Sequence, residues 1–349
     1  MSKNSGIQGL RALAAILVVF QHAIYFSCLA KGVDFARYLP IGFGQAGVGI
    51  FFVISGYVMT LCIGQELRFM SNRIARIYPS YWAAVLLSAL LLPLLGREWH
   101  FSLYSLTLFP ASVFNESYAI PYWTLVYEVV FYAIMYVCIV FRRSRGQIAA
   151  ILATWAGSIV LVCQSGVHPE FHSDIGAMLA GKWILLSPAN FGFIAGALYG
   201  LVGKDLLKGA NPVSLAVQAL VLFILAQTLA PIPYYVRYAL WGLAFTLLLH
   251  LSQGIRVSRY LERAGDYSYG LYLTHTIFTG VAMYAMLRLM PGAPLLAFFA
   301  AAFGLALAGG LMFGAAEHVF HSLVIKGVLK RIASRKLIGA HPDGPAPAG

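Results

Sequence analysis

Apolar stretches of about twenty residues follow one another along almost the whole 349-residue chain, separated by short polar segments. A run of this length matches an α-helix that crosses the hydrocarbon core of a bilayer. The chain is 60% hydrophobic and 10% charged, whereas a soluble domain carries about 25% charged residues. The polar residues are too few to cover a soluble surface, so the sequence predicts an all-α, polytopic membrane protein.

Ten apolar segments are long enough to be membrane-spanning helices. They are residues 7–29, 41–63, 78–95, 122–141, 147–164, 183–203, 213–230, 234–252, 268–289 and 295–315. The stretch 101–114 is shorter and contains Pro110, so it is expected to be interfacial or re-entrant rather than spanning. Residues 1–330 are expected to form one membrane domain. Residues 331–349, basic and then rich in Pro, Gly and Ala, are expected to be a disordered cytoplasmic tail.

The net charge of +12 predicts the topology of the chain. With ten spans and a cytoplasmic N-terminus, 17 of the 24 Lys and Arg residues fall inside and 6 outside, as expected for basic cytoplasmic loops. A further span at 101–114 would move Arg142, Arg143 and Arg145 outside. Both termini are therefore predicted to be cytoplasmic, with the protein in the cell inner (cytoplasmic) membrane, and no nucleic-acid partner is expected. The cysteines are widely spaced in apolar segments, which predicts neither a disulfide framework nor a metal site.

Two ionisable residues lie in the first span, and a third lies in the fourth. Arg11 and His22 are eleven residues apart, which is about three turns, so both should point to one side of their helix, ~16 Å apart along its axis. Glu128 lies about as deep as His22 when depth is counted from the outer end of each span. The two are predicted to pair, with Glu128 orienting the imidazole of His22 as a general base.

Other polar residues are predicted nearer the cytoplasmic side. Counted from the inner end of its span, His275 lies closer to the level of Arg11 than to that of His22, and Tyr272 shares its helix face. Arg73 and Arg76 are expected on a short amphipathic stretch. Pro79 would then fall in the first turn of the next helix, where proline is favoured.

Each feature also has a purely structural interpretation. Arg11 can snorkel to the interface, and Arg73 and Arg76 can be positive-inside anchors. His275 can be a buried histidine bonded to a backbone carbonyl. His22 and Glu128 are harder to explain structurally, because ionisable groups within spans are functional by default.

The functional interpretation joins these residues to one ligand. A molecule with an anionic head at the inner face and a reactive end deep in the membrane would reach from Arg11 to His22. Acyl-coenzyme A has this shape, and Arg73 and Arg76 would bind its phosphates by charge-assisted bonds. An acceptor would approach His22 from the outer side.

Five segments resemble, in order, the motifs of the integral-membrane acyltransferase 3 family. They are GLRALAAILVVFQH with Arg-x10-His, GQAGVGIFFVISGYVM, RFMSNRIARIYPSYW with Arg-x-x-Arg-x-x-Pro, YWTLVYEVVFY and YSYGLYLTHTIF. The resemblance implies O-acyl transfer, commonly of acetyl, from acyl-CoA to a hydroxyl of a glycan or lipid-linked glycan, as in exopolysaccharide or lipopolysaccharide modification, or to a macrolide. It also implies contact with membrane lipid.

The resemblance assigns essential roles to Arg11 and His22. It extends to Arg73, Arg76, Glu128 and His275 as further site residues. The predicted donor-binding residues are Arg11, Arg73, Arg76, Tyr272 and His275. Thr124 stands where the family often has Ser, and an SGNH-hydrolase-like domain is not expected after the tenth span. The rival hypothesis is a transporter or flippase of a lipid-linked sugar or an anionic lipid, with Arg11 and His22 lining its path.

Overall fold

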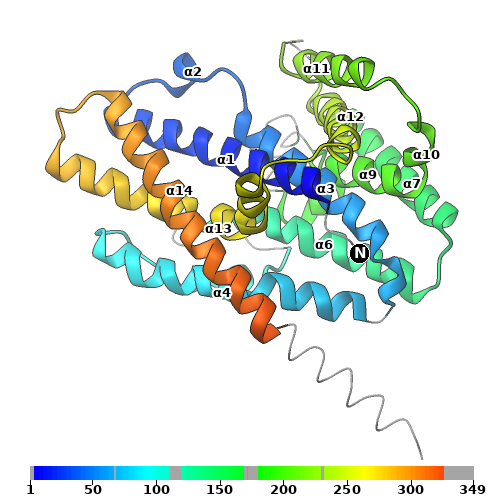
Figure 1. Cartoon of the computed structure of the whole chain (residues 1–349), viewed down its shortest axis with the longest axis horizontal. Helices are drawn as coiled ribbons and strands as arrows, with labels where there is room; N and C mark the ends of the chain where they lie inside the picture. The colour runs from blue at the N-terminus through cyan, green and yellow to red at the C-terminus, as the bar shows by residue number, and fades with distance from the viewer. Residues whose placement is uncertain are drawn as a thin grey trace, which may run out of the picture.

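The computed structural model describes residues 4–66, 68–110, 119–168, 171, 180–228 and 232–325, and these residues form helices without a β-strand (Figure 1). The longer helices are α1 (Ser5–Lys31), α3 (Phe43–Leu61), α4 (Arg68–Leu94), α6 (Trp123–Val140), α7 (Arg145–Ser165), α9 (Asn190–Leu198), α11 (Pro212–Thr228), α12 (Tyr234–Ser252), α13 (Arg259–Leu289) and α14 (Leu295–Phe320). The shorter elements are α2 (Phe35–Tyr38), η1 (Ile63–Gln65), α5 (Leu103–Thr107), η4 (Gly181–Leu186), η5 (Tyr199–Gly203), α10 (Lys204–Leu206) and η6 (His321–Ile325). The predicted tail at 331–349 lies outside the described residues.

Helices occupy all ten predicted spans. Eight of these segments are long and apolar enough to cross a membrane. One of the eight, Gly181–Leu206, comprises the consecutive elements η4, α9, η5 and α10. The two helices that are not among these eight are α11 and α12. Helix α11 has only 17 residues, and α12 has 19 but carries Arg237 and His250. These observations confirm the all-α, polytopic architecture, while the count of ten spans and the sidedness of the termini remain predictions.

Two helices begin well before their predicted spans. Helix α4 runs without interruption from Arg68, so Pro79 lies inside it and not in its first turn as predicted. The segment containing Arg73 and Arg76 is therefore part of the same continuous helix as Tyr81. Helix α13 begins at Arg259, where the Ser258 side chain caps it by accepting from the Leu261 amide.

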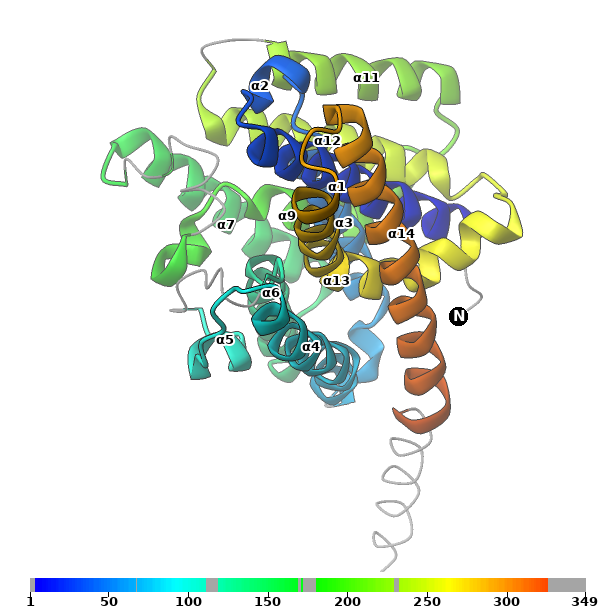
Figure 2. The same cartoon turned by 90° about the vertical axis from the view of Figure 1, so that its left-hand side faces the viewer.

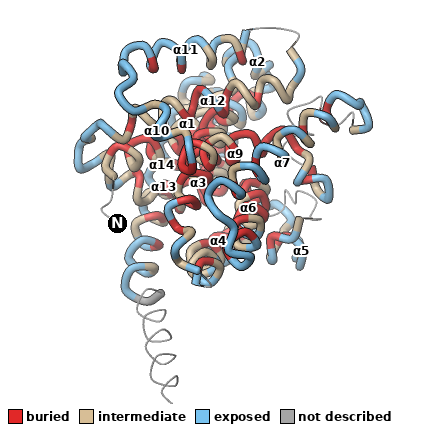
Figure 3. Tube along the Cα trace, turned by 90° about the vertical axis from the view of Figure 1, so that its right-hand side faces the viewer, coloured by how far each residue is buried: buried red, intermediate tan, exposed pale blue. Residues whose placement is uncertain are grey.

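Helix α1 lies in the middle of the molecule, between α3 and α13. Helix α14 packs along α13, and α9 packs along α3, whereas α11 contacts the rest of the chain mainly through α12 (Figure 2). Buried residues gather around α1, α3, α9 and α13, and α11 is largely exposed (Figure 3).

Glycines allow α3 and α9 to approach closely. A Cβ atom at Gly56 would lie 2.1 Å from the Phe193 carbonyl oxygen, and one at Gly196 would lie 2.0 Å from the Val53 carbonyl oxygen. Small residues let membrane helices approach until their backbones touch. The position of α3 beside α9 therefore depends on these two glycines.

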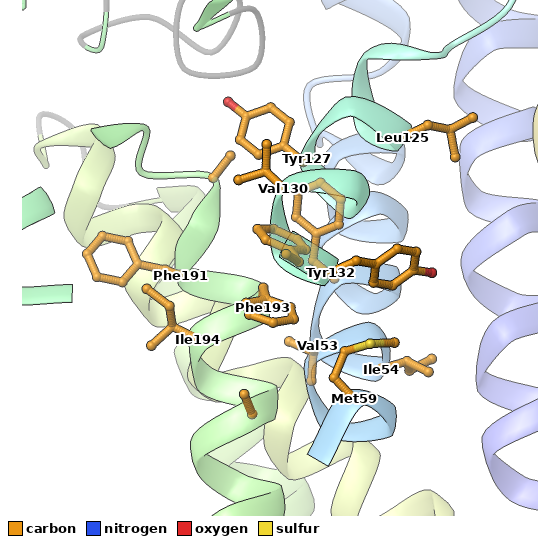
Figure 4. Close-up of a cluster of buried hydrophobic side chains, with 14 of the residues drawn as sticks. Val53, Ile54, Met59, Leu125, Tyr127, Val130, Tyr132, Phe191, Phe193 and Ile194 are labelled. Atoms are coloured by element: carbon orange, nitrogen blue, oxygen red, sulfur yellow. The ribbon is translucent and has the colours of Figure 1, made fainter. Parts of the chain in front are cut away.

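Helix α6 packs against the apolar side chains of α3 and α9 (Figure 4). The rings of Phe131 and Phe193 stack with their centroids 3.9 Å apart. Tyr132 and Leu125 extend to the side of α6 away from Phe191. One side of α6 is thus committed to packing, and the other is available to a site.

The chain between α4 and α6 folds back along α4. The Trp99 indole donates to Ser88, and the hydroxyls of Tyr81 and Tyr78 donate to the carbonyl oxygens of Ser105 and Thr107, at 3.0, 2.7 and 2.8 Å. Leu94 and Tyr78 are sixteen residues apart in α4, which is ~24 Å along the helix axis. The chain after α4 runs back over this distance. The described part of 101–114 therefore lies along α4, and its placement as interfacial or re-entrant stays a prediction. Residues 111–118 lie outside the described residues.

The four cysteines are all buried and free. This agrees with the prediction that they form no disulfide framework. Cys62 also accepts a hydrogen bond from the Arg73 guanidinium, at 2.9 Å from Sγ. The thiol at the end of α3 therefore helps to hold that arginine.

Candidate functional site

A cavity of about 130 Å³ lies among α1, α3, α4, α6 and α13. Its polar lining consists of Arg11, Ser55, Arg73, Arg76, Thr124, Glu128, Tyr132, Tyr269 and Tyr272. Five of the seven predicted site residues thus line this cavity, and they come from four helices: Arg11, Arg73, Arg76, Glu128 and Tyr272. His22 and His275 are not among the lining residues.

Three arginines bring positive charge to this cavity. Arg73 lies over the rings of Phe69 and Tyr132, and Arg76 lies over the ring of Tyr269, at 5.5, 5.8 and 5.8 Å from the ring centroids. Among the described residues, none of the three guanidinium groups forms an ion pair with a carboxylate. Half-buried cations without an ion pair are costly, so the charge of this cavity would suit an anionic ligand.

Glu128 is the carboxylate of this cavity. It accepts a hydrogen bond from the Tyr132 hydroxyl one turn later on α6, and the charged groups that act on Arg11 are Arg76, Glu128 and Asp266. Glu128 has no hydrogen bond to His22. The predicted His22–Glu128 pair is therefore wrong.

The physical reason is the depth at which α6 begins. The Thr124 hydroxyl in its first turn lies 2.8 Å from the hydroxyl of Tyr272, halfway along α13. Helix α6 therefore starts at the level of the middle of α13, because the preceding segment first runs back along α4. Counting from the outer end placed Glu128 too far out.

His22 lies beyond the cavity, toward the other end of α1. Its Nδ1–H donates to the Val18 carbonyl oxygen at 2.9 Å. This hydrogen bond fixes the ring and leaves the Nε2 lone pair available as a base. The backbone of α1 thus orients His22, which is the role that the sequence had predicted for Glu128.

His275 is the neighbour of His22. The two ring centroids are 4.9 Å apart with the planes at 69°, and His275 donates its own Nδ1–H to the Tyr272 carbonyl oxygen at 2.7 Å. The expected level of His275, near Arg11, is therefore wrong. Helices α1 and α13 pack in parallel, and the backbone of Gln8 contacts Gly265, which lies ten residues before His275. Farther along the same pair of helices, His275 therefore lies beside His22.

The two parts of the site meet at Tyr272. Tyr272 lines the cavity, and its ring centroid lies 5.9 Å from that of His275. Arg11 and His22 face the same neighbouring helix, α13, as their eleven-residue spacing predicts. The arrangement is an arginine-lined cavity followed, through Tyr272, by a pair of histidines.

Sequence reasoning missed three members of the site. Tyr132 holds Glu128, Ser55 places a buried, unpaired hydroxyl at the cavity, and Asp266 acts electrostatically on Arg11. The i, i+4 spacing of Glu128 and Tyr132 was a readable signal. Ser55 and Asp266 carried none, because their relevance depends on how helices are placed beside each other.

Comparison with known proteins gives a family for this site. The family model for the acyltransferase domain of acyltransferase family 3 matches residues 4–314. The exopolysaccharide production protein ExoZ of Rhizobium meliloti (strain 1021) is 28% identical over 279 residues, which cover 72% of this chain and 81% of that protein. No solved structure matches. The match spans every helix that contributes to the cavity, and the chain belongs to the acyltransferase 3 family of membrane acyltransferases.

Proposed function

We propose that the protein is an O-acyltransferase that moves an acyl group, acetyl in the simplest case, from acyl-CoA to a hydroxyl of a cell-surface or lipid-linked glycan. The observation that carries the proposal is the cavity with three arginines and one carboxylate, Glu128, in which none of the arginines forms an ion pair among the described residues. Guanidinium groups bind phosphate oxygens through paired, charge-assisted hydrogen bonds. A donor with several phosphates supplies the missing negative charge.

The cavity leads toward the histidines. Its lining continues from Arg76 past Tyr269 to Tyr272, which is one turn from His275. A thin, extended arm attached to the phosphates would follow these tyrosines toward His22. Glu128, held by Tyr132, balances part of the positive charge when the donor is absent.

The reaction requires a base near the acceptor hydroxyl, and His22 has the necessary tautomer. Its Nε2 takes the hydroxyl proton while the hydroxyl oxygen forms a bond to the thioester carbonyl carbon. The carbon–sulfur bond then breaks, and the thiolate of CoA takes the proton from His22. The ester and free CoA are the products, and His22 returns to its neutral form.

The name of a relative supports the proposed acceptor class. The exopolysaccharide production protein ExoZ is a relative of this chain, which supports a glycan hydroxyl as the acceptor. The donor would bind from the cytoplasmic side and the acceptor from the outer side, in accord with the predicted orientation in the inner membrane.

The test uses purified full-length protein in detergent or nanodiscs with acetyl-CoA and a glycan acceptor. Release of free CoA that depends on the acceptor, with a product heavier by one acetyl group, supports the enzyme. Movement of a lipid-linked sugar or anionic lipid across a vesicle membrane without acyl chemistry would support the rival transporter or flippase. Mass spectrometry of cell-surface glycans with and without the gene identifies the acceptor.

A further inference from the structure

Two imidazole rings lie together in the interior, and they have the same hydrogen-bonding state. His22 and His275 each donate Nδ1–H to a carbonyl oxygen of their own helix, Val18 and Tyr272. Each ring therefore carries its lone pair on Nε2. The centroids are 4.9 Å apart and the planes meet at 69°.

His275 is the unusual member of this pair. Its side chain is 0% exposed, and its Nε2 has no hydrogen-bond partner among the described residues. A buried acceptor without a donor costs free energy, so such a group needs a reason to be retained. A neighbour that becomes a donor during the reaction supplies one.

His22 is that neighbour. As a base it acquires a proton on Nε2 and becomes an imidazolium, and no carboxylate among the described residues acts on this half-buried ring. Glu128 lies with the arginines and not with His22, and His22 is the one titratable group that acts electrostatically on His275 among the described residues. Phe26 covers another side of His22, with its ring centroid 6.3 Å away.

We propose that His275 is a positioning residue that stays neutral and stabilises the protonated form of His22 during acyl transfer. It does so by offering its Nε2 lone pair and its ring to the new cation. This role rests on the proposed function, in which His22 is the base. In this role His275 takes the place of the carboxylate partner that other catalytic histidines use, and it does not bind the donor.

The experiment compares four full-length proteins in nanodiscs: wild type, His275→Phe, His275→Gln and His318→Phe. Phenylalanine keeps an aromatic ring and removes the lone pair, whereas the glutamine amide can still accept a hydrogen bond. His318 is exposed on α14 against Tyr267 and serves as the matched control. The kcat of acyl transfer and the KM for acetyl-CoA are measured separately.

We expect His275→Phe to lower kcat by about 10- to 100-fold, the range for losing a hydrogen bond to a charged group, with the KM for acetyl-CoA within about twofold of wild type. His275→Gln should recover part of kcat, and His318→Phe should match wild type. If the phenylalanine variant does not accumulate in the membrane, the glutamine variant carries the test, with a kcat below that of wild type at unchanged KM.

Three results separate failure of this role from failure of the function. An active wild type with unchanged kcat in the His275 variants overturns the positioning role alone. A raised KM at unchanged kcat also overturns it and assigns His275 to donor binding. A wild-type protein that releases no CoA from any acyl-CoA overturns the proposed function and the role of His275 with it.

Discussion

The hydroxyl groups of Thr124 and Tyr272 lie 2.8 Å apart and join the first turn of α6 to the middle of α13. Tyr272 is thirteen residues, ~20 Å, beyond the first residue of α13. Because α6 begins at this depth, Glu128 reaches the cavity with Arg11 and leaves His22 to another partner. One contact between two helices thus separates the candidate site into an arginine-lined cavity and a pair of histidines.

This contact should be measurable as a coupling in catalysis. We expect Thr124→Val and Tyr272→Phe each to lower kcat/KM, and the double variant to be less impaired than the product of the two effects by about 1 kcal/mol, the value of a shared hydrogen bond. Thr124→Ser keeps the hydroxyl and should match wild type. Strictly additive losses would show that the two hydroxyls act independently.

Removing the base should stop the chemistry without unfolding the protein. His22→Ala is expected to lower acyl transfer by about 10²- to 10⁴-fold, the usual contribution of a general base. The variant should accumulate in the membrane, because the half-buried ring is tied only to the Val18 carbonyl of its own helix. Normal product acylation by this variant would exclude His22 as the base.

Neutralising the cavity arginines should weaken donor binding. Arg11→Gln and Arg76→Gln are each expected to raise the KM for acetyl-CoA by about 10- to 100-fold, because each loses charge-assisted hydrogen bonds to phosphate. Arg68→Gln removes the same charge from the exposed start of α4 and is the control. An equal effect of all three substitutions would mean that overall charge, and not the cavity, attracts the donor.

The close approach of α3 and α9 should be sensitive to a single methyl group. Gly56→Ala places a Cβ atom 2.1 Å from the Phe193 carbonyl oxygen, so the helices must separate, at a cost of about 1–3 kcal/mol. Gly157→Ala on α7 meets open space and should gain up to about 1 kcal/mol from helix propensity. Thermal unfolding in detergent measures both, and equal stability of the two variants would contradict the packing argument.

The predicted topology can be tested with reporter proteins fused at the C-terminus and in two connections between helices. Reporters that need the cytoplasm should be active at the C-terminus and at Ser144, between α6 and α7. Reporters that need the outside should be active at Gly166, after α7. Activity on the opposite sides would reverse the orientation derived from the excess of basic residues.

The sequence alone determined the helices and their membrane character. Runs of apolar residues set the positions of the elements, because a backbone in hydrocarbon must satisfy its hydrogen bonds within each helix. Spacing along a single helix was also informative for Arg11 and His22, which both lie beside α13. These properties depend on residues that are near each other in the chain.

Only the tertiary structure decided which residues meet across helices. The prediction paired His22 with Glu128 because it counted depth from assumed helix ends. In the structure, the chain before α6 folds back along α4 and α13 starts early, so both helices are shifted along their axes. A shift of two or three turns leaves the apolar pattern of a helix intact but changes every lateral neighbour. That is why the sequence named the residues of the site, and the packing alone paired His22 with His275 and Glu128 with the arginines.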